Sequence, residues 1–178
     1  MANSENHPDF DAVVIGAGFA GLGMLRKLRE EHGMSVQVYE TGDGVGGTWY
    51  WNHHPGARFD SESYSYGYSF SEEVPAEWDW SEHFAAQPET LRHLNFVADK
   101  FDLRTDIQFS ARVGAAIFDE ARDCWDVTLE DDGRARSRFL ITAVGPLSTP
   151  VMPNIEGIDE FKGESFHTGQ WPHDPVSF

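Results

Sequence analysis

The sequence is poor in cationic side chains and has one cysteine in 178 residues. Lysine and arginine number 13 against 30 aspartate and glutamate residues, so the net charge is −17. Nucleic acids and anionic membrane surfaces bind cationic faces, and the deficit argues against both as partners. We interpret the acidity as a source of solubility. A single cysteine excludes an internal disulfide framework and favours a reducing, cytoplasmic compartment. We interpret this residue, Cys124, as a packing residue and not a nucleophile.

Long apolar runs are also missing. No stretch approaches the roughly 20 apolar residues of a membrane-spanning helix, and the polar N-terminus has no segment typical of a secretory signal. We expect no membrane partner and a disordered tail over residues 1–9. His53 and His54 are adjacent and point in different directions, so we predict no metal site.

The stretch over 10–40 has the pattern of a dinucleotide-binding unit. Its apolar β-branched run over 13–15 predicts a buried parallel strand. Gly16, Gly18 and Gly21 follow directly as GxGxxG. The first glycine permits a tight turn, the second lets a pyrophosphate approach the backbone, and the third lets a helix pack closely. The alternative is that these glycines serve only packing.

The residues after the glycines complete this unit. Good helix formers over 22–32 predict a helix that ends at Gly33. A second strand over 36–39 then leads to Glu40, which is 19 residues after the last glycine of the motif. An acid at this spacing can accept a hydrogen bond from a ribose hydroxyl, so the unit predicts a dinucleotide site.

A second glycine-rich loop follows, over 41–47, and Thr48, Trp49 and Trp51 come directly after it. Loops past strand ends lie where ligands bind in open α/β sheets. Backbone amides and the threonine hydroxyl suit a phosphate, and the indoles suit a ring system. The alternative is a mobile surface loop. The segment Gly42–Gly46 imitates half of the GxGxxG pattern, but we expect no helix after it.

Arg58 and Asp60 are two positions apart, so an extended segment would point both to one side. Asp60 near a heterocycle would fix its polarity or hold a cation, and Arg58 would pair with it or meet a phosphate. A local salt bridge between the two is the equally weighted structural alternative.

The second half of the chain predicts one helix and several short strands. Apolar residues at helical spacing indicate a helix over 87–102. A β-meander is expected over about 107–140, with strands over 107–109, 112–118, 125–129 and 135–140. A separate strand over 139–145 would re-enter the main sheet and make a close backbone approach at Gly145. The predicted fold is therefore α/β: a Rossmann-like domain over 10–145, with a parallel sheet, helices and an inserted antiparallel meander, followed by a linker over 146–178.

The segment Phe161–Pro172 has the form FxGxxxHxxxWP. With the first glycine motif, Gly47–Trp51, Pro55–Asp60 and Thr142–Gly145, in the same order, it resembles the type I Baeyer–Villiger monooxygenases of the flavin-containing monooxygenase superfamily. Within this family it resembles the phenylacetone monooxygenase-like enzymes. The resemblance covers the chain from about residue 10 onward.

This resemblance implies a flavoprotein with two dinucleotide domains, one for FAD and one for NADP(H). NADPH would reduce FAD, O₂ would add to form a flavin peroxide, and a ketone would become an ester or lactone. The implied catalytic residues are Asp60 near the reactive centre, Arg58 facing the nicotinamide, and His167, which would couple domain movement to catalysis. From the residues alone, His167 as a general base was the alternative.

The resemblance also implies a set of FAD contacts. The pyrophosphate, ribose, ribityl, flavin and adenine parts would be met by Gly16, Gly18, Phe19, Ala20, Gly21, Glu40, Gly47, Thr48, Trp49, Tyr50, Asp60, Tyr66 and Val113.

The sequence departs from the family in length, because it contains no second strand–GxGxxG–helix unit. We therefore expect an N-terminal portion that needs the remainder of the enzyme, in cis or in trans, for the NADP domain and the C-terminal FAD segment. Alone it should be inactive, and it should expose the apolar sheet face that the missing segments would cover, which invites association. The alternatives are an N- or S-oxidising flavin monooxygenase and a non-catalytic FAD-binding subunit.

Overall fold

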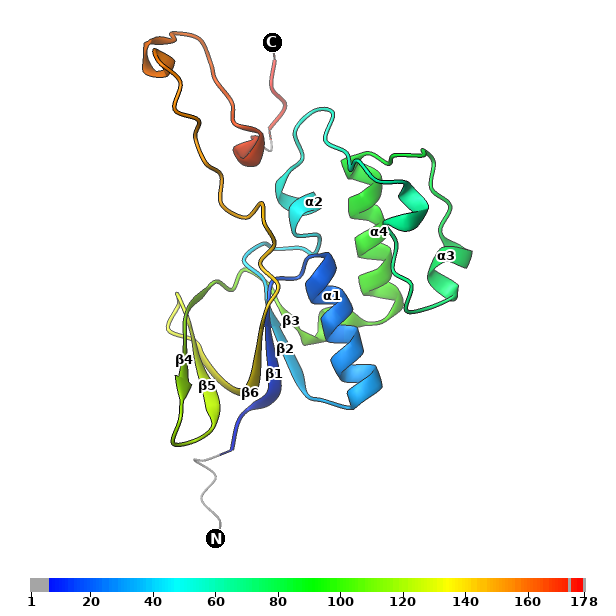
Figure 1. The fold of residues 1–178 in the computed structure, drawn as a ribbon, viewed down its shortest axis with the longest axis vertical. Coiled ribbons are helices and arrows are strands. Elements are labelled where there is room, and N and C mark those ends of the chain that lie inside the picture. The colour runs from blue at the N-terminus through cyan, green and yellow to red at the C-terminus, as the bar shows by residue number, and fades with distance from the viewer. Residues whose placement is uncertain (1–6, 173, 178) are drawn as a thin grey trace.

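The computed structural model describes residues 7–172 and 174–177. The predicted tail over 1–9 therefore lies outside the described residues for positions 1–6. One six-stranded sheet, in the order β3-β2-β1-β6-β5-β4, organises the chain (Figure 1). Its strands are β1 (Phe10–Ile15), β2 (Val36–Tyr39), β3 (Ile107–Gln108), β4 (Val113–Asp119), β5 (Cys124–Leu129) and β6 (Arg134–Thr142).

The centre of the sheet is parallel. β1 pairs in parallel with β2 on one edge and with β6 on the other, and β2 pairs in parallel with β3. Val13 and Val14 in β1 are fully buried, as expected for a strand covered on both faces. The predicted Rossmann-like fold with an antiparallel extension is confirmed by this arrangement.

The antiparallel part corrects two predictions. The strand predicted over 107–109 as part of the meander is β3, which pairs in parallel with β2 at the opposite edge of the sheet. The second correction concerns a boundary. β4 pairs with β5 and β5 with β6, both antiparallel, but β6 is one strand and not two. Ser137 is opposite Trp125 of β5 on one edge and opposite Phe10 of β1 on the other. A strand has two hydrogen-bonding edges, so β6 closes the meander and re-enters the parallel sheet at once. The separate strands expected over 135–140 and 139–145 were therefore wrong.

The longer helices lie on one side of the sheet (Figure 1). α1 (Phe19–Arg26) continues into a π-helical turn, η2 (Lys27–Glu31), and Gly33 follows with φ +62°, which favours glycine. α4 (Gln87–Lys100) has Pro88 in its first turn, where a missing N–H costs little. It ends two residues before the expected position. Asp102, two residues after the end of α4, has φ 48° and lies in the left-handed region of backbone conformation.

Two short helices complete this layer, α2 (Thr48–Trp51) and α3 (Glu73–Glu77). The prediction that no helix follows Gly42–Gly46 was wrong, because α2 begins directly after Gly47. Tertiary contacts hold it: Trp49 is buried, and the Gln87 side-chain amide donates to the Trp49 carbonyl. The short 3₁₀ turns are η3 (Ser63–Ser65), η4 (Leu103–Asp106), η5 (Ile158–Glu160) and η6 (Thr168–Gln170).

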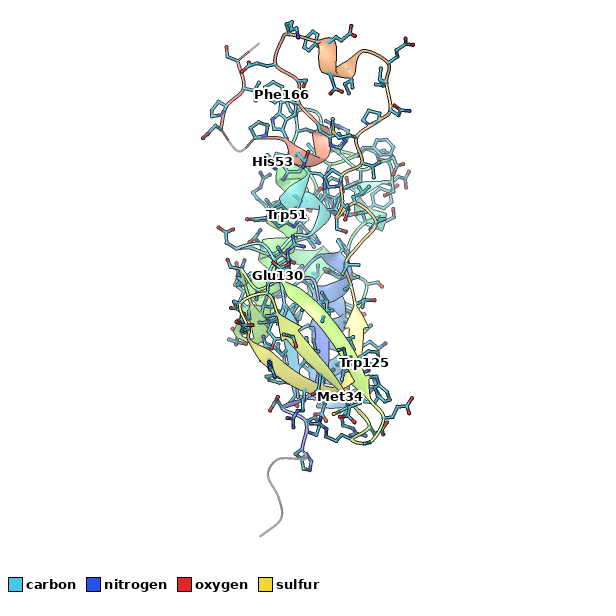
Figure 2. The ribbon with its side chains drawn as sticks, turned by 90° about the vertical axis from the view of Figure 1, so that its left-hand side faces the viewer. Met34, Trp51, His53, Trp125, Glu130 and Phe166 are labelled. Atoms are coloured by element: carbon cyan, nitrogen blue, oxygen red, sulfur yellow. The ribbon has the colours of Figure 1, made fainter. Side chains whose placement is uncertain are left out.

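Past β6 the chain leaves the sheet, extends away from it and returns near α2 (Figure 1). His53 lies beside the returning segment (Figure 2), and its Nε2 is 3.3 Å from the Pro172 carbonyl oxygen. This connector, residues 146–172, exposes many apolar side chains, among them Leu147, Val151 and Phe161. In the described residues, no helix has the length and apolar character needed to cross a membrane.

Candidate functional site

A cavity of about 490 Å³ opens where β1, β2 and β6 end. Its walls come from five segments: the turn into α1, the stretch from the end of β2 into α2, Tyr66 after η3, the residues before β4, and the chain leaving β6. The carboxyl ends of parallel strands are where open α/β folds bind ligands, and the volume falls within the roughly 300–1,000 Å³ of small-molecule sites. We call it the nucleotide cavity.

The first glycine motif forms one wall by close backbone contact. Gly16 has φ +100°, and a Cβ there would lie 2.7 Å from the Ala143 carbonyl oxygen. A Cβ on Gly21 would lie 1.8 Å from the Gly16 carbonyl oxygen. The first and third glycines therefore let α1 start against the ends of β1 and β6. This agrees with the sequence-based interpretation of the first and third glycines.

The second glycine brings two loops together. A Cβ on Gly18 would lie 3.2 Å from the Cα of Gly47, and one on Gly47 would lie 2.7 Å from the Cα of Gly18. The Gly46 N–H also donates to the Ala17 carbonyl at 3.0 Å. The first and second glycine loops therefore form one continuous backbone wall. The first turn of α1 adds amides that have no partner within the helix, and such amides attract anions.

Glu40 holds these loops in place. Its Oε2 accepts from the Ala17 N–H at 2.7 Å and its Oε1 from the Gly42 N–H at 2.8 Å. The residue is 5% exposed and lines the nucleotide cavity. Each carboxylate oxygen has a further lone pair, so the group can also accept a hydroxyl proton from a ligand. The carboxylate thus has a structural function that the spacing alone did not indicate.

Aromatic side chains form the opposite wall. Trp49 Nε1 donates to Tyr66 Oη at 3.0 Å, and the Tyr66 ring stacks on Phe59 with centroids 4.3 Å apart. Phe19 stacks on Tyr68, whose hydroxyl donates to the Phe19 carbonyl at 2.6 Å. Burial raises the pKa of Tyr68, so its hydroxyl stays protonated as that donor. These contacts hold Trp49 and Tyr66, both lining residues, in fixed orientations.

Most of the predicted cofactor residues meet at this cavity. Those that line it are Gly16, Gly18, Phe19, Ala20, Glu40, Gly47, Thr48, Trp49, Tyr66 and Val113. Gly21 and Tyr50 are outside the lining: Gly21 packs under the first loop, and the Tyr50 hydroxyl donates to Asp43 Oδ1 at 2.5 Å.

The three predicted catalytic residues are elsewhere. Asp60 is exposed and does not line the nucleotide cavity. Arg58 pairs with Glu82 at 2.9 Å and donates to the Phe84 carbonyl, so its ion pair is not with Asp60. His167 caps the start of η6, where its Nδ1 accepts from the Gly169 N–H at 3.1 Å.

Two parts of the wall hold none of the predicted cofactor contacts, although the sequence indicated a motif over 142–145. Residues 143–149 line the cavity, and the expected close approach at Gly145 is instead at Ala143, because nothing lies within 4 Å of a Cβ on Gly145. Arg112 also lines the cavity, 3.8 Å from the Glu130 carboxylate. Arg112 could have been predicted as a lining residue because it directly precedes Val113, a predicted cofactor contact.

The residues that line the nucleotide cavity are suited to binding a ligand and not to acting as catalytic nucleophiles or bases. Among the described residues that line the cavity, none is histidine, cysteine or lysine. Nor does the described part of the chain contain three histidine, cysteine, aspartate or glutamate side chains grouped to hold a metal ion. The walls instead supply amides for an anion, a carboxylate for hydroxyls and flat rings for a heterocycle.

Comparison with known proteins supports this interpretation. Residues 14–74 match the NAD(P)-binding Rossmann-like domain family. The chain is 51% identical to a 2-oxo-Δ³-4,5,5-trimethylcyclopentenylacetyl-CoA monooxygenase from Pseudomonas putida, over 98% of this chain and 32% of that protein. It is 47% identical to phenazine N-monooxygenase PhzNO1 from Lysobacter antibioticus, over 97% of this chain and 31% of the relative. A Baeyer–Villiger monooxygenase from Pseudooceanicola batsensis is 45% identical, over 92% and 30%.

A solved structure agrees. The OTEMO complex with FAD and NADP superposes with a TM-score of 0.85 at 51% identity, covering 94% of this chain and 31% of that one. The chain thus spans about a third of the length of the curated relatives it matches. Over that third it is similar to a Baeyer–Villiger monooxygenase and to other monooxygenases, and it has a Rossmann-like fold.

Proposed function

We propose that the nucleotide cavity binds FAD. The amides at the start of α1, together with Arg112, would meet the diphosphate, because both supply positive charge to an anion. Glu40 would accept from the adenosine ribose. Trp49 and Tyr66 would face the flat flavin ring, and the backbone of Val113 would meet adenine. The residues present fit the cofactor in charge, hydrogen bonding and shape.

The observation that carries the proposal is the joining of the two glycine loops through Gly18 and Gly47. A single loop suits any dinucleotide, whereas the second loop extends the backbone wall toward the aromatic rings. That places an anion site and a flat apolar wall in one cavity. The FAD complex of a structure 51% identical supports the same assignment.

For the whole protein we propose an NADPH- and O₂-dependent Baeyer–Villiger monooxygenase that converts ketones to esters or lactones. FAD, when bound, supplies the redox and oxygen chemistry. The residues that line the nucleotide cavity would hold and orient it. Arg58 and Asp60 would lie toward the nicotinamide cofactor, and His167 would transmit domain movement. The NADP domain and the rest of the FAD site would come from the remainder of the enzyme. A cytoplasmic location is supported by the single, buried Cys124.

An N-oxidising monooxygenase is the second candidate function. The phenazine N-monooxygenase relative is 47% identical, close to the 45% of the Baeyer–Villiger monooxygenase named above. The nucleotide cavity serves both reactions, because both need a bound flavin. The third candidate is an FAD-binding subunit without activity of its own, whose NADP domain would come from a separate partner protein.

FAD binding is tested by titrating the purified protein with FAD and following flavin fluorescence, with riboflavin as the matched ligand lacking the diphosphate and adenosine. We expect FAD to bind at least about a hundredfold more tightly, since several charge-assisted hydrogen bonds are added. Equal affinity for riboflavin would contradict the assignment of the anion site.

The reaction is tested separately. NADPH consumption and product formation are measured with a cyclic ketone and with a phenazine. Residues 1–178 alone should give no turnover, and turnover should appear when the remainder of a related enzyme is supplied. Ester or lactone formation supports the first function, N-oxide formation supports the second, and turnover by residues 1–178 alone contradicts the need for a partner.

A further inference from the structure

A second cavity, of about 330 Å³, lies where the segment around α3 packs against α4 (Figure 1). It shares no lining residue with the nucleotide cavity. Its volume is within the roughly 300–1,000 Å³ typical of small-molecule sites. Two tyrosines, two tryptophans and one carboxylate are among its lining residues: Tyr64, Tyr68, Trp78, Trp80 and Asp79. We call it the aromatic cavity.

The aromatic residues of this wall are accessible to a ligand. Tyr64 is 68% exposed, and Tyr68, Trp78 and Trp80 are each partly exposed. The centroids of the two indole rings are 5.8 Å apart and their planes are inclined by 72°, so these rings form a corner and not a flat surface. The faces of aromatic rings carry partial negative charge, which attracts a cation placed over them.

The charges at the aromatic cavity also favour a cation. Asp79 is exposed, and its carboxylate forms no hydrogen bond or ion pair with the described residues. His93 lines the cavity too, but burial lowers the pKa of its ring to about 4, so it is neutral at pH 7. No lysine or arginine is among the described lining residues. Lys100 of α4 is paired with Glu73 and Glu77 of α3, at 3.0 and 2.9 Å.

We propose that the aromatic cavity binds a small quaternary ammonium ion. Its methyl groups would contact the ring faces, and its charge would lie near the Asp79 carboxylate. Such an ion has no N–H group, so aromatic faces and one carboxylate are sufficient to hold it. A primary ammonium ion has three N–H donors that need acceptors, and ring faces replace oxygen acceptors poorly. A neutral molecule of the same shape gains nothing from the carboxylate.

The test compares three probes on the same protein. Choline carries the quaternary ammonium group, 3,3-dimethyl-1-butanol has the same shape with an uncharged carbon in place of the nitrogen, and n-butylammonium carries a primary ammonium group. Isothermal titration calorimetry without FAD measures each dissociation constant. We expect choline to bind at least about tenfold more tightly than either other probe, because the rings and the carboxylate both favour its charge. Equal or tighter binding of either other probe, or no binding of choline, overturns the proposal.

A substitution of the carboxylate locates the bound ion. Asp79→Asn keeps the size of the side chain and removes its charge, so choline should bind about threefold more weakly, while binding of 3,3-dimethyl-1-butanol should not change. Asp123→Asn is the matched control. It removes an exposed acid in the turn between β4 and β5, outside the lining of this cavity, and should leave choline binding unchanged.

Two substitutions of Tyr64 test the ring faces at a position exposed enough to tolerate change. Tyr64→Phe keeps the ring and should keep most of the affinity for choline, whereas Tyr64→Leu removes the ring and should weaken binding about threefold. Circular dichroism checks that each variant folds. Unchanged affinity in both Asp79→Asn and Tyr64→Leu would place choline elsewhere and overturn the proposal. The three-probe comparison on the unaltered protein decides the proposal even if a variant does not fold.

Discussion

Buried His93 makes the stability of this protein depend on pH in a predictable direction. Its pKa is lowered by burial from 6.5 to about 4, and a negative partner, Glu89, only partly opposes this. In the unfolded chain the ring takes up a proton as pH falls through 6.5, whereas the folded protein resists until about pH 4. The unfolded state therefore binds more protons in this window, and the free energy of unfolding falls as pH falls.

The magnitude follows from the same shift. A difference between 6.5 and about 4 corresponds to about 3 kcal/mol at full effect, or about 1.4 kcal/mol per pH unit within the window. Between pH 7.5 and pH 5 the contribution of His93 is then about 2 kcal/mol. Because the residue is 1% exposed, solvent screening removes little of it. Small domains have only about 5–15 kcal/mol in total, so the loss is measurable.

Urea unfolding at pH 7.5 and pH 5, followed by circular dichroism, measures this effect. The unaltered protein should lose about 2 kcal/mol more than His93→Phe between the two pH values, since phenylalanine cannot take up a proton. His32→Gln, a change at an exposed histidine, controls for loss of an imidazole in general. Equal pH dependence in the unaltered protein and His93→Phe, or the same difference in His32→Gln, would refute the reasoning.

Three further predictions concern the nucleotide cavity and the surface. Gly21→Ala should destabilise the fold by about 2 kcal/mol or more, because its Cβ would meet a backbone oxygen at 1.8 Å; Gly67→Ala, with open space around it, should stay within about 0.5 kcal/mol, and thermal unfolding compares the two. Glu40→Ala should weaken FAD binding more than His167→Ala, as dissociation constants measured on the completed enzyme will show. The exposed apolar connector should bind a hydrophobic dye and promote association; a monomer without dye binding would contradict this.

The elements predicted best are those encoded within a few residues. β1, α1 and β2 follow from an apolar run, glycines at fixed spacing and helix formers, all of which act locally. α2 was missed because four residues carry too little helical preference of their own, and the burial of Trp49 holds them. β6 was divided in two because the apolar pattern does not reveal that a strand uses both edges.

The site divides in the same way. Ten of the predicted cofactor residues line one cavity, since the positions of strand ends follow from the order of the elements. The partners of charged groups were not predictable. Arg58 pairs with Glu82 and not with Asp60. The choice between these two carboxylates depends on which loops approach one another in the folded chain.

For this protein, the sequence alone determined a nucleotide-binding α/β unit with glycines where backbones must touch and an acid at the end of β2. These follow from steric exclusion and local periodicity. Only the tertiary structure decided that the Glu40 carboxylate joins two loops and that the His93 ring is buried with no hydrogen-bond partner among the described residues. Both depend on contacts between segments far apart in the chain, and no local pattern of residues encodes such contacts.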